Sequence, residues 1–187
     1  MTTGLPTDAP YVPILVNIDN VRGAWPQWGI KDADIIYEMP IHGLSLTRLM
    51  GLFAYVHPEE VGPTRSGRVM HAEMREEWDA AWVYVGVQKK EGSDVNQVLR
   101  KLEVRKKDVN LLIDGATGRN AKYFKNIKGY GSPHNHSVNL AQVKADVQAY
   151  TFPQRAFLFT DDLPTAGVPA SKIALRYGTD GNSYTNS

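Results

Sequence analysis

Apolar residues along this chain gather in short runs separated by turn signals, a pattern typical of buried β-strands. Each run is strand-sized, and most are rich in Val, Ile, Leu or aromatic residues. The predicted strands occupy residues 12–18, 34–39, 46–56, 81–87, 110–114, 157–159 and 172–177. The last of them alternates apolar and polar positions, so it needs a partner strand.

A helix is predicted over residues 67–79, where Met70, Met74 and Trp78 recur at the spacing of one helical stripe. Methionine and aromatic side chains at this spacing usually pack into a core. We therefore interpret the stripe as core packing and not as a ligand site.

Two more helices are predicted, over residues 94–103 and 139–150. Ser93 and Asn139 are the expected N-caps, because short polar side chains accept hydrogen bonds from first-turn amides. Strands and helices mix without a regular βαβ order, and no glycine-rich phosphate fingerprint follows any strand. The pattern predicts an α+β fold with a mixed β-sheet and about three helices.

Length and composition narrow the class of protein. The 187 residues suit one large domain or two small ones, and we expect a main domain over residues 1–170 and the start of a truncated C-terminal segment over 171–187. No cysteine is present, which excludes disulfides, thiolate zinc sites and a cysteine nucleophile. The net charge of +1 gives no bulk attraction to nucleic acid or to an anionic membrane.

The run from Gly62 to Arg68, directly before the first predicted helix, is the most informative for chemistry. Ser66 is the expected N-cap there, and Gly67 would let the backbone approach a ligand closely. Arg65 and Arg68 stand beside amides that a helix start leaves unpaired, which predicts an anion pocket for a phosphate or carboxylate. The alternative is that the arginines form structural ion pairs with Asp32, Asp34 or Glu38.

A second cluster, Ser132 to Ser137, contains two histidines. In an extended segment His134 and His136 share one face, a spacing used by zinc sites, with a third ligand from His42, His71, Asp114 or Glu38. Alternatively, His134 acts as an acid–base and Asn135 orients a substrate oxygen, or both residues cap loop backbone groups. The cluster has no adjacent carboxylate motif, so we expect no metal and no cofactor.

A third cluster surrounds the second predicted strand. Trp25 and Trp28 either form an aromatic platform for a sugar ring or cover the core. Glu38 lies at a strand end, a usual place for a catalytic carboxylate, although most such carboxylates are only solvated. Arg48 lies inside an apolar strand and needs a partner, for which Glu38 is the expected choice.

Taken together, these residues resemble a known family. The motifs that carry the resemblance are residues 17–20, 26–29, 33–38, 62–68 and 133–135, with Gly43, Thr47 and Arg48. They are similar to the N-terminal domain of the YerB-type lipoprotein family, a domain of unknown function. The resemblance extends from about Gly4 to Asn139, and its most specific parts are the Gly-Pro-x-Arg-Ser-x-Arg run and the Pro-His-Asn triplet.

The resemblance implies an extracytoplasmic protein, lipid-anchored to the cell membrane through an anchor that this chain lacks, typically in Gram-positive bacteria. It supplies no reaction. The polar set shared with the family comprises Asn20, Gln27, Asp34, Glu38, Thr47, Arg48, Arg65, Ser66, Arg68, His134 and Asn135. Departures from the family pattern occur at Trp25, His42, Val87, Gln88 and His136.

The expected function is binding of an anionic cell-wall polymer or an envelope protein through Arg65, Arg68 and the helix start. The ligand-binding set also includes Asn20, Gln27, Arg48, Ser66 and Asn135. The alternative is a hydrolase or transferase acting on a cell-wall polymer, with His134 as acid–base and Glu38 or Asp34 as its partner carboxylate. A nucleic-acid binder using the basic loop 118–131 is disfavoured by the near-neutral charge.

Overall fold

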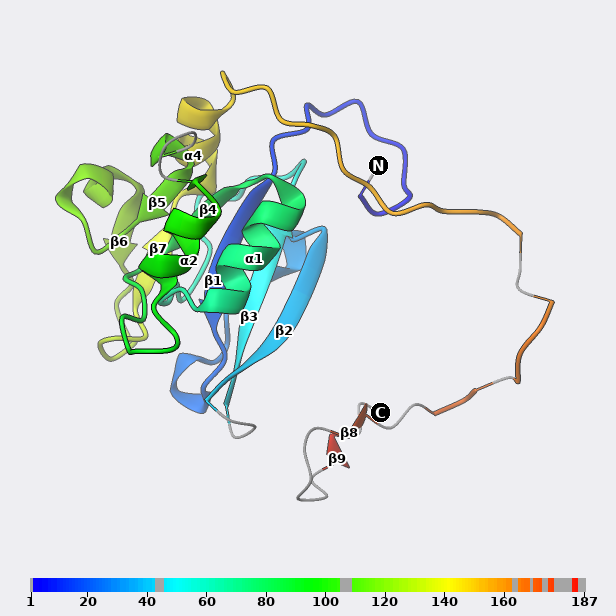
Figure 1. Ribbon diagram of the computed structural model, residues 1–187, viewed down its shortest axis with the longest axis horizontal. Helices are drawn as coiled ribbons and strands as arrows, with labels where there is room; N and C mark the ends of the chain where they lie inside the picture. Colours follow the sequence, from blue (N-terminus) through cyan, green and yellow to red (C-terminus); the bar gives the residue numbers. More distant parts are fainter. Residues whose placement is uncertain are drawn as a thin grey trace.

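A five-stranded mixed sheet forms the centre of the molecule, with the strand order β2-β3-β1-β4-β5 (Figure 1). The computed structural model describes residues 2–42, 46–104, 109–162, 165–168, 170–172, 175–176 and 183–184. The sheet contains β1 (Ile14–Asp19), β2 (Ile35–His42), β3 (Leu46–Phe53), β4 (Ala81–Tyr84) and β5 (Leu112–Asp114). β1 pairs antiparallel with β3 and parallel with β4, so both pairing modes meet at the central strand.

Helices and two smaller strand pairs complete the described fold. The α-helices are α1 (Val69–Trp78), α2 (Val95–Lys101) and α4 (Leu140–Val147), and the 3-10 helices are η1 (Arg22–Ala24), η2 (Ile30–Asp32), η3 (Val109–Leu111) and η4 (Gly118–Tyr123). β6 (Phe124–Asn126) pairs with β7 (His136–Val138), and β8 (Leu175–Arg176) pairs with β9 (Ser183–Tyr184). The predicted α+β class with a mixed sheet is confirmed.

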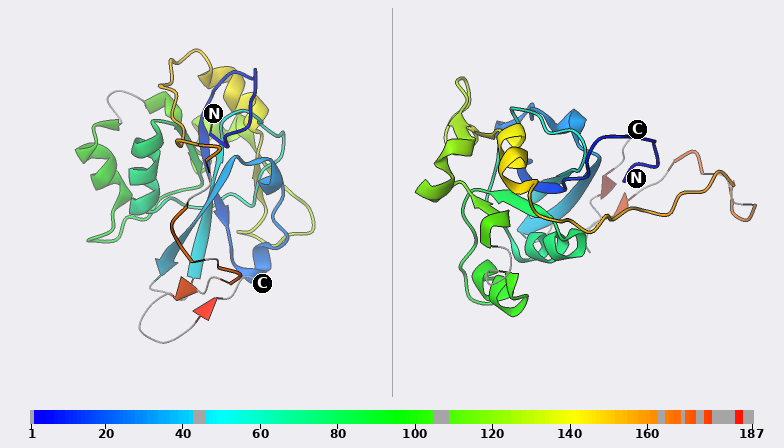
Figure 2. Two further views of the ribbon diagram at one scale, coloured as in Figure 1. Left: turned by 90° about the vertical axis from the view of Figure 1, so that its right-hand side faces the viewer. Right: turned by 90° about the horizontal axis from the view of Figure 1, so that it is seen from above.

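The helices cover both faces of the sheet. Figure 2 shows α1 and α2 against one face and α4 against the other. Apolar side chains form one cluster under α1 and α2 and a second cluster under α4. Since β1 faces both clusters, its residues Ile14, Leu15, Val16 and Ile18 are all fully buried, which explains the continuous apolar run in the sequence.

The helix ends differ in part from the expectations. Asn139 is the N-cap of α4, where its side chain accepts a hydrogen bond from the Gln142 amide at 2.9 Å. The prediction of Ser93 as a cap is wrong, because Asp94 fills that role by accepting from the Asn96 amide at 2.9 Å.

Other local predictions also change. The loop predicted over 118–131 contains η4 and β6, since three-residue strands carry almost no periodic signal. Residues 157–159 form no strand and run as an extended segment with exposed side chains. Of the strand predicted over 172–177, Leu175 and Arg176 are in β8, while 173, 174 and 177 lie outside the described residues, as does Gly43.

Candidate functional site

The segment from Val61 to Arg68 lies across the carboxyl ends of the parallel strands β1 and β4. The amide of Arg65 donates to the carbonyl of Asn17 at 3.0 Å, and the carbonyl of Arg65 accepts from the amide of Val85 at 3.1 Å. The amide of Gly67 donates to the carbonyl of Gly86 at 2.9 Å. Main-chain bonds to β1 and to the two residues that follow β4 therefore fix the arginine segment at the edge of the sheet where ligands of open α/β sheets usually bind.

The local roles of Ser66 and Gly67 differ from the predicted ones. A Cβ atom on Gly67 would lie 2.7 Å from the indole of Trp82, so glycine is needed for packing and not for approach to a ligand. Helix α1 begins at Val69 and its N-cap is Arg68, so the prediction of Ser66 as the cap is wrong.

Ser66 instead joins two arginine side chains. Its hydroxyl oxygen accepts from Nη1 of Arg68 at 2.8 Å and from Nη1 of Arg48 at 3.2 Å. Its carbonyl oxygen accepts from Arg48 at 2.6 Å. Two guanidinium groups therefore contact one neutral hydroxyl. Unit charges roughly 6 Å apart or less, at an effective dielectric constant near 20, repel each other by about 3 kcal/mol.

Arg65 and His134 meet on a single carboxylate. Oδ2 of Asp19 accepts from Nε of Arg65 at 2.7 Å and lies 2.8 Å from Nδ1 of His134. The Asp19 side chain is 1% exposed, whereas those of Arg65 and His134 are 28% and 24% exposed. A buried carboxylate at the end of β1 thus orients two half-buried side chains toward the surface.

The charges of this region do not balance. Within the described residues, Asp19 is the only carboxylate that forms an ion pair with Arg48, Arg65 or Arg68, a set called here the arginine cluster. Burial, followed by the charge of Arg68, lowers the pKa of Arg48 to about 10, so its guanidinium is still protonated at neutral pH. Burial and the charge of Arg65 lower the pKa of Arg68. The cluster therefore holds an excess of positive charge.

Two buried donors beside the arginine cluster lack acceptors. The Nε–H of Arg48, a residue only 3% exposed, has no hydrogen-bond partner in the described part of the chain. The ring of His71 accepts the amide of Arg68 through Nδ1 at 3.0 Å, which places the ring proton on Nε2, and this Nε2 also has no partner. Burial and then the charges of Arg48 and Arg68 lower the pKa of His71 to about 3, so the ring is neutral.

The buried side-chain amide of Asn17 contacts this histidine and holds its ring in place. Nδ2 of Asn17 lies 3.2 Å from Nδ1 of His71 and donates to the carbonyl of Ser66 at 3.2 Å, while Oδ1 of Asn17 accepts from the indole of Trp82 at 3.0 Å. Asn17 and His71 are both fully buried. The network therefore ties β1, β4 and the first turn of α1 into one support for the arginine cluster.

Asn20 lies at the centre of a separate polar network beside Asp19. Its Nδ2 donates to Thr47 at 2.8 Å and to Glu38 at 3.3 Å, and its Oδ1 accepts from Gln27 at 3.1 Å and from the indole of Trp25 at 3.3 Å. Because these groups satisfy one another, the network holds the loop after β1 in place. It leaves few free donors or acceptors for a ligand.

The expected carboxylate partners are not those observed. The prediction that Glu38 or Asp34 pairs with His134 is wrong, since His134 contacts Asp19 and Asp34 accepts from the amide of Ala54 at 2.6 Å. The expected pair between Arg48 and Glu38 is also wrong, because Glu38 accepts from Thr47 at 2.6 Å and Arg48 contacts Ser66. Asp32, Asp34 and Glu38 form no ion pair with Arg65 or Arg68 in the described structure.

The remaining predicted residues are placed as follows. Oδ1 of Asn135 is buried without a partner, next to His134 in the chain. The two tryptophans separate: the indole of Trp28 donates to Ser137 at 2.9 Å, whereas Trp25 is 57% exposed. Among the described residues, no three His, Asp or Glu side chains are grouped so that they could hold a metal ion, and the side chain of His42 lies outside that description.

The comparison with protein families decides the classification. A family model described as "Protein of unknown function (DUF3048) N-terminal domain" matches residues 2–152. The chain belongs to this family. The resemblance to YerB-type proteins is thereby confirmed. None of the helices in the described ranges is both long and apolar enough to cross a bilayer.

Two similar proteins extend this result. The curated "Putative lipoprotein YerB" of Bacillus subtilis (strain 168) is 28% identical over an aligned region 196 residues long, gaps included, and the alignment covers 98% of this chain and 54% of the relative. The chain thus spans about half the length of that relative. The crystal structure of YerB protein from Bacillus subtilis matches with a TM-score of 0.70 and 23% identity, over 97% of this chain and 59% of that one. At this identity the likeness shows the fold alone.

The roles of three residues beside the arginine cluster were missed by the sequence reading: Asp19 and Asn17 entered only through the 17–20 motif, and His71 only as a possible zinc ligand. A usable signal existed for Asp19, a charged residue that ends a buried apolar run at the carboxyl end of a strand. Asn17 offered a similar signal as an amide inside the same run. No local pattern marks His71, because its role depends on contacts with residues far away in the sequence.

Proposed function

We propose that this domain binds an anionic ligand of the bacterial cell envelope through the arginine cluster. The observation that carries the proposal is the hydroxyl of Ser66, which two guanidinium groups share, while among the described residues only one carboxylate, Asp19, pairs with the cluster, through Arg65. A phosphate or carboxylate would relieve this repulsion through contacts with the half-buried guanidinium groups of Arg65 and Arg68.

Helix α1 adds to the attraction. Arg68 is the residue before its first turn, where amides lack intrahelical acceptors and the helix dipole favours negative charge. The envelope part of the proposal rests on a relative that is named a lipoprotein, a class anchored to membranes. An anionic wall polymer or an acidic surface of an envelope protein would suit the cluster.

The direct test is calorimetric titration of the chain with inorganic phosphate at low ionic strength. The native chain should bind, and Arg68→Ala should weaken binding at least tenfold while the melting temperature changes little. Arg100→Ala is the matched control, because Arg100 is an exposed arginine on α2, away from the cluster. No binding by the native chain, or an equal loss in Arg100→Ala, would contradict the proposal.

A second candidate function is hydrolysis of a cell-wall polymer at the same place. The contact of 2.8 Å between Asp19 and Nδ1 of His134 favours it, because a carboxylate on Nδ1 leaves Nε2 of a neutral ring as the free base. Gly23 is a neighbour of this Nε2, since a Cβ atom on Gly23 would lie 3.8 Å from it. Glycine therefore places no side chain beside the nitrogen.

Binding and hydrolysis can be separated with one variant. His134→Asn should retain phosphate affinity within about threefold and should lose any turnover of bis(p-nitrophenyl) phosphate that the native chain shows. Absence of turnover in the native chain would remove the hydrolase and leave the binding proposal standing.

A further inference from the structure

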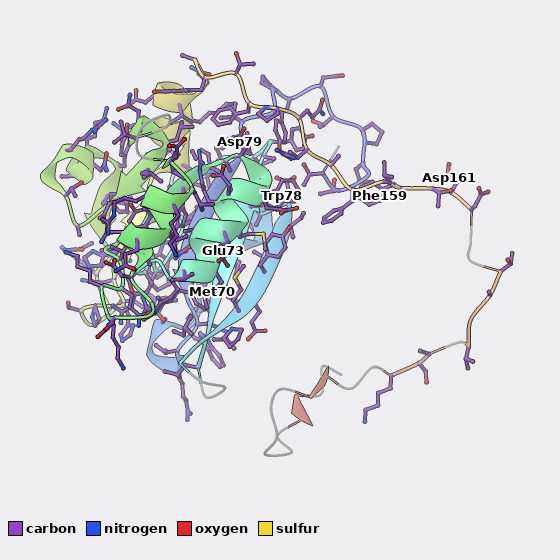
Figure 3. The ribbon with its side chains drawn as sticks, in the orientation of Figure 1. Met70, Glu73, Trp78, Asp79, Phe159 and Asp161 are labelled. Carbon is purple, nitrogen blue, oxygen red and sulfur yellow. The ribbon has the colours of Figure 1, made fainter. Side chains whose placement is uncertain are left out.

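A groove of about 940 Å³ lies between helix α1, strand β2 and the extended segment 154–157. Figure 3 shows Met70, Glu73 and Trp78 following one another along α1, from its first turn to its last. The volume falls within the roughly 300–1,000 Å³ that is usual for ligand pockets. The groove is therefore large enough for part of a small molecule.

Methionines give the groove an apolar and adaptable lining. Three of the five methionines of the chain, Met39, Met70 and Met74, line it, together with Tyr37 and Trp78. The prediction that the helical stripe is core packing holds for Trp78, which is buried, and in part for Met74, which is half-buried and packs against the core cluster under α1, whereas Met70 is half-buried outside that cluster. Exposed thioether side chains are common on surfaces that accept apolar ligands of varied shape.

The arginine cluster is not part of the groove lining, but it lies next to two lining residues, Met39 and Met70. In the sheet, Arg48 of β3 lies directly opposite Met39 of β2 on one side and Asp19 of β1 on the other, so all three side chains project from the same face. On the helix, Arg68 immediately precedes the first turn that carries Met70. The end of the groove that contains Met39 and Met70 therefore lies beside the positive charge of the arginine cluster.

We infer that the groove and the arginine cluster form one binding site for an anionic amphiphile, a phosphate monoester with a single long alkyl or isoprenoid chain. This inference rests on the proposed function, since the arginine cluster would hold the phosphate. The apolar chain lies along α1 between Met39, Met70 and Met74 and points toward Trp78.

The charges along the groove support an uncharged chain. Glu38, Glu73 and Glu77 line it, with Arg155 as the only cation among its lining residues. A second anionic group would meet these carboxylates, so a polyanion would extend away from the groove. An acidic polymer would use the arginines alone, and a neutral lipid would leave them unpaired.

The test measures affinity for inorganic phosphate, butyl phosphate and octyl phosphate at concentrations below micelle formation. Each fully buried methylene should strengthen binding about fourfold, so the four extra methylenes of octyl phosphate should tighten binding by up to about 250-fold relative to butyl phosphate, and by at least about thirtyfold if they are partly buried. Octyl glucoside, which has the same chain and no charge, should bind at least tenfold more weakly than octyl phosphate.

Variants locate the chain in the groove. Met74→Gln should reduce octyl phosphate affinity at least fivefold and leave inorganic phosphate affinity unchanged, while Met74→Leu restores the chain-length dependence. Val56→Gln, at an exposed apolar position outside the lining, is the control and should change neither affinity. Equal affinity for butyl and octyl phosphate would overturn the inference but not the anion site. Failure of all three phosphates to bind would overturn the proposed function itself.

Discussion

The two ends of helix α1 each hold buried arginine, but they treat its charge in opposite ways. At the carboxyl end, Arg75 is fully buried, donates to the carbonyl of Ala80 at 2.8 Å and pairs with Glu76 at 3.0 Å and Asp79 at 3.9 Å. At the amino end, the arginine cluster has one paired carboxylate in the described part of the chain, Asp19, which contacts Arg65 alone. The first end is neutralised within the protein, while the second keeps a positive charge that a ligand can neutralise.

This difference separates structural charge from available charge. A buried guanidinium surrounded by its own carboxylates stabilises a helix end and offers nothing to a ligand. A guanidinium held only by neutral oxygens, as Arg48 is by Ser66, retains its full charge for an external anion. Substitution of the arginine at the carboxyl end should therefore mainly lower stability, whereas substitution of an arginine at the amino end should mainly weaken anion binding.

The largest effect on stability is expected for Asp19→Ala. It removes the one carboxylate of the described chain that pairs with the arginine cluster, which should cost about 3–5 kcal/mol of unfolding free energy in urea titrations. Added phosphate should restore part of the loss, since it replaces the missing negative charge. The exposed Asp8→Ala is the control, and an equal loss in that variant would contradict the charge argument.

At the other end of the helix, Arg75→Met should lower the unfolding free energy by about 2–3 kcal/mol. The substitution leaves the Ala80 carbonyl without its donor and exposes the helix terminus to two unpaired carboxylates. Phosphate affinity measured by calorimetry should remain unchanged. Weaker phosphate binding in this variant would erase the distinction between the two ends.

His71 should make stability depend on pH. Its folded pKa of about 3 lies below the ordinary value of 6.5, so the contribution is present above pH 6.5 and is lost as the pH falls toward 3. Between pH 6.5 and 4.5 the native chain should lose about 2 kcal/mol more than His71→Asn, which cannot titrate. If the unfolding free energies of the two proteins fell equally with pH, protonation of the His71 ring would cost no stability, which would contradict this prediction.

The sequence was a good guide to local structure and a weaker one to the site. The buried run of β1 and the cap at Asn139 follow from local patterns, and the structure contains both. The strands β6 and β7 were missed because they are only three residues long and mostly polar, unlike the equally short but apolar β5. Local patterns resolve neighbours along the chain, not pairings across it.

The site depended on such pairings. Arg65 and Arg68 were recognised because they flank a helix start, but the partner of His134 was assigned to the wrong carboxylate. Asp19 lies 115 residues from His134 in the chain, and only the return of β7 beside the 61–68 segment brings them together. The excess of positive charge in the arginine cluster could not be predicted either, because it depends on which carboxylates do not pair with these arginines in the folded chain.

The measurement that tests the central claim most directly is the melting temperature of Arg48→Met with and without phosphate. Methionine fills a similar buried volume without charge, so stability in phosphate-free buffer should stay within about 1 kcal/mol of the native value or rise. Phosphate at ten times its dissociation constant should stabilise the native chain by about 1.4 kcal/mol and the variant far less. A variant that unfolds readily yet still gains full stability from phosphate would show that Arg48 supports the fold and does not hold an anion.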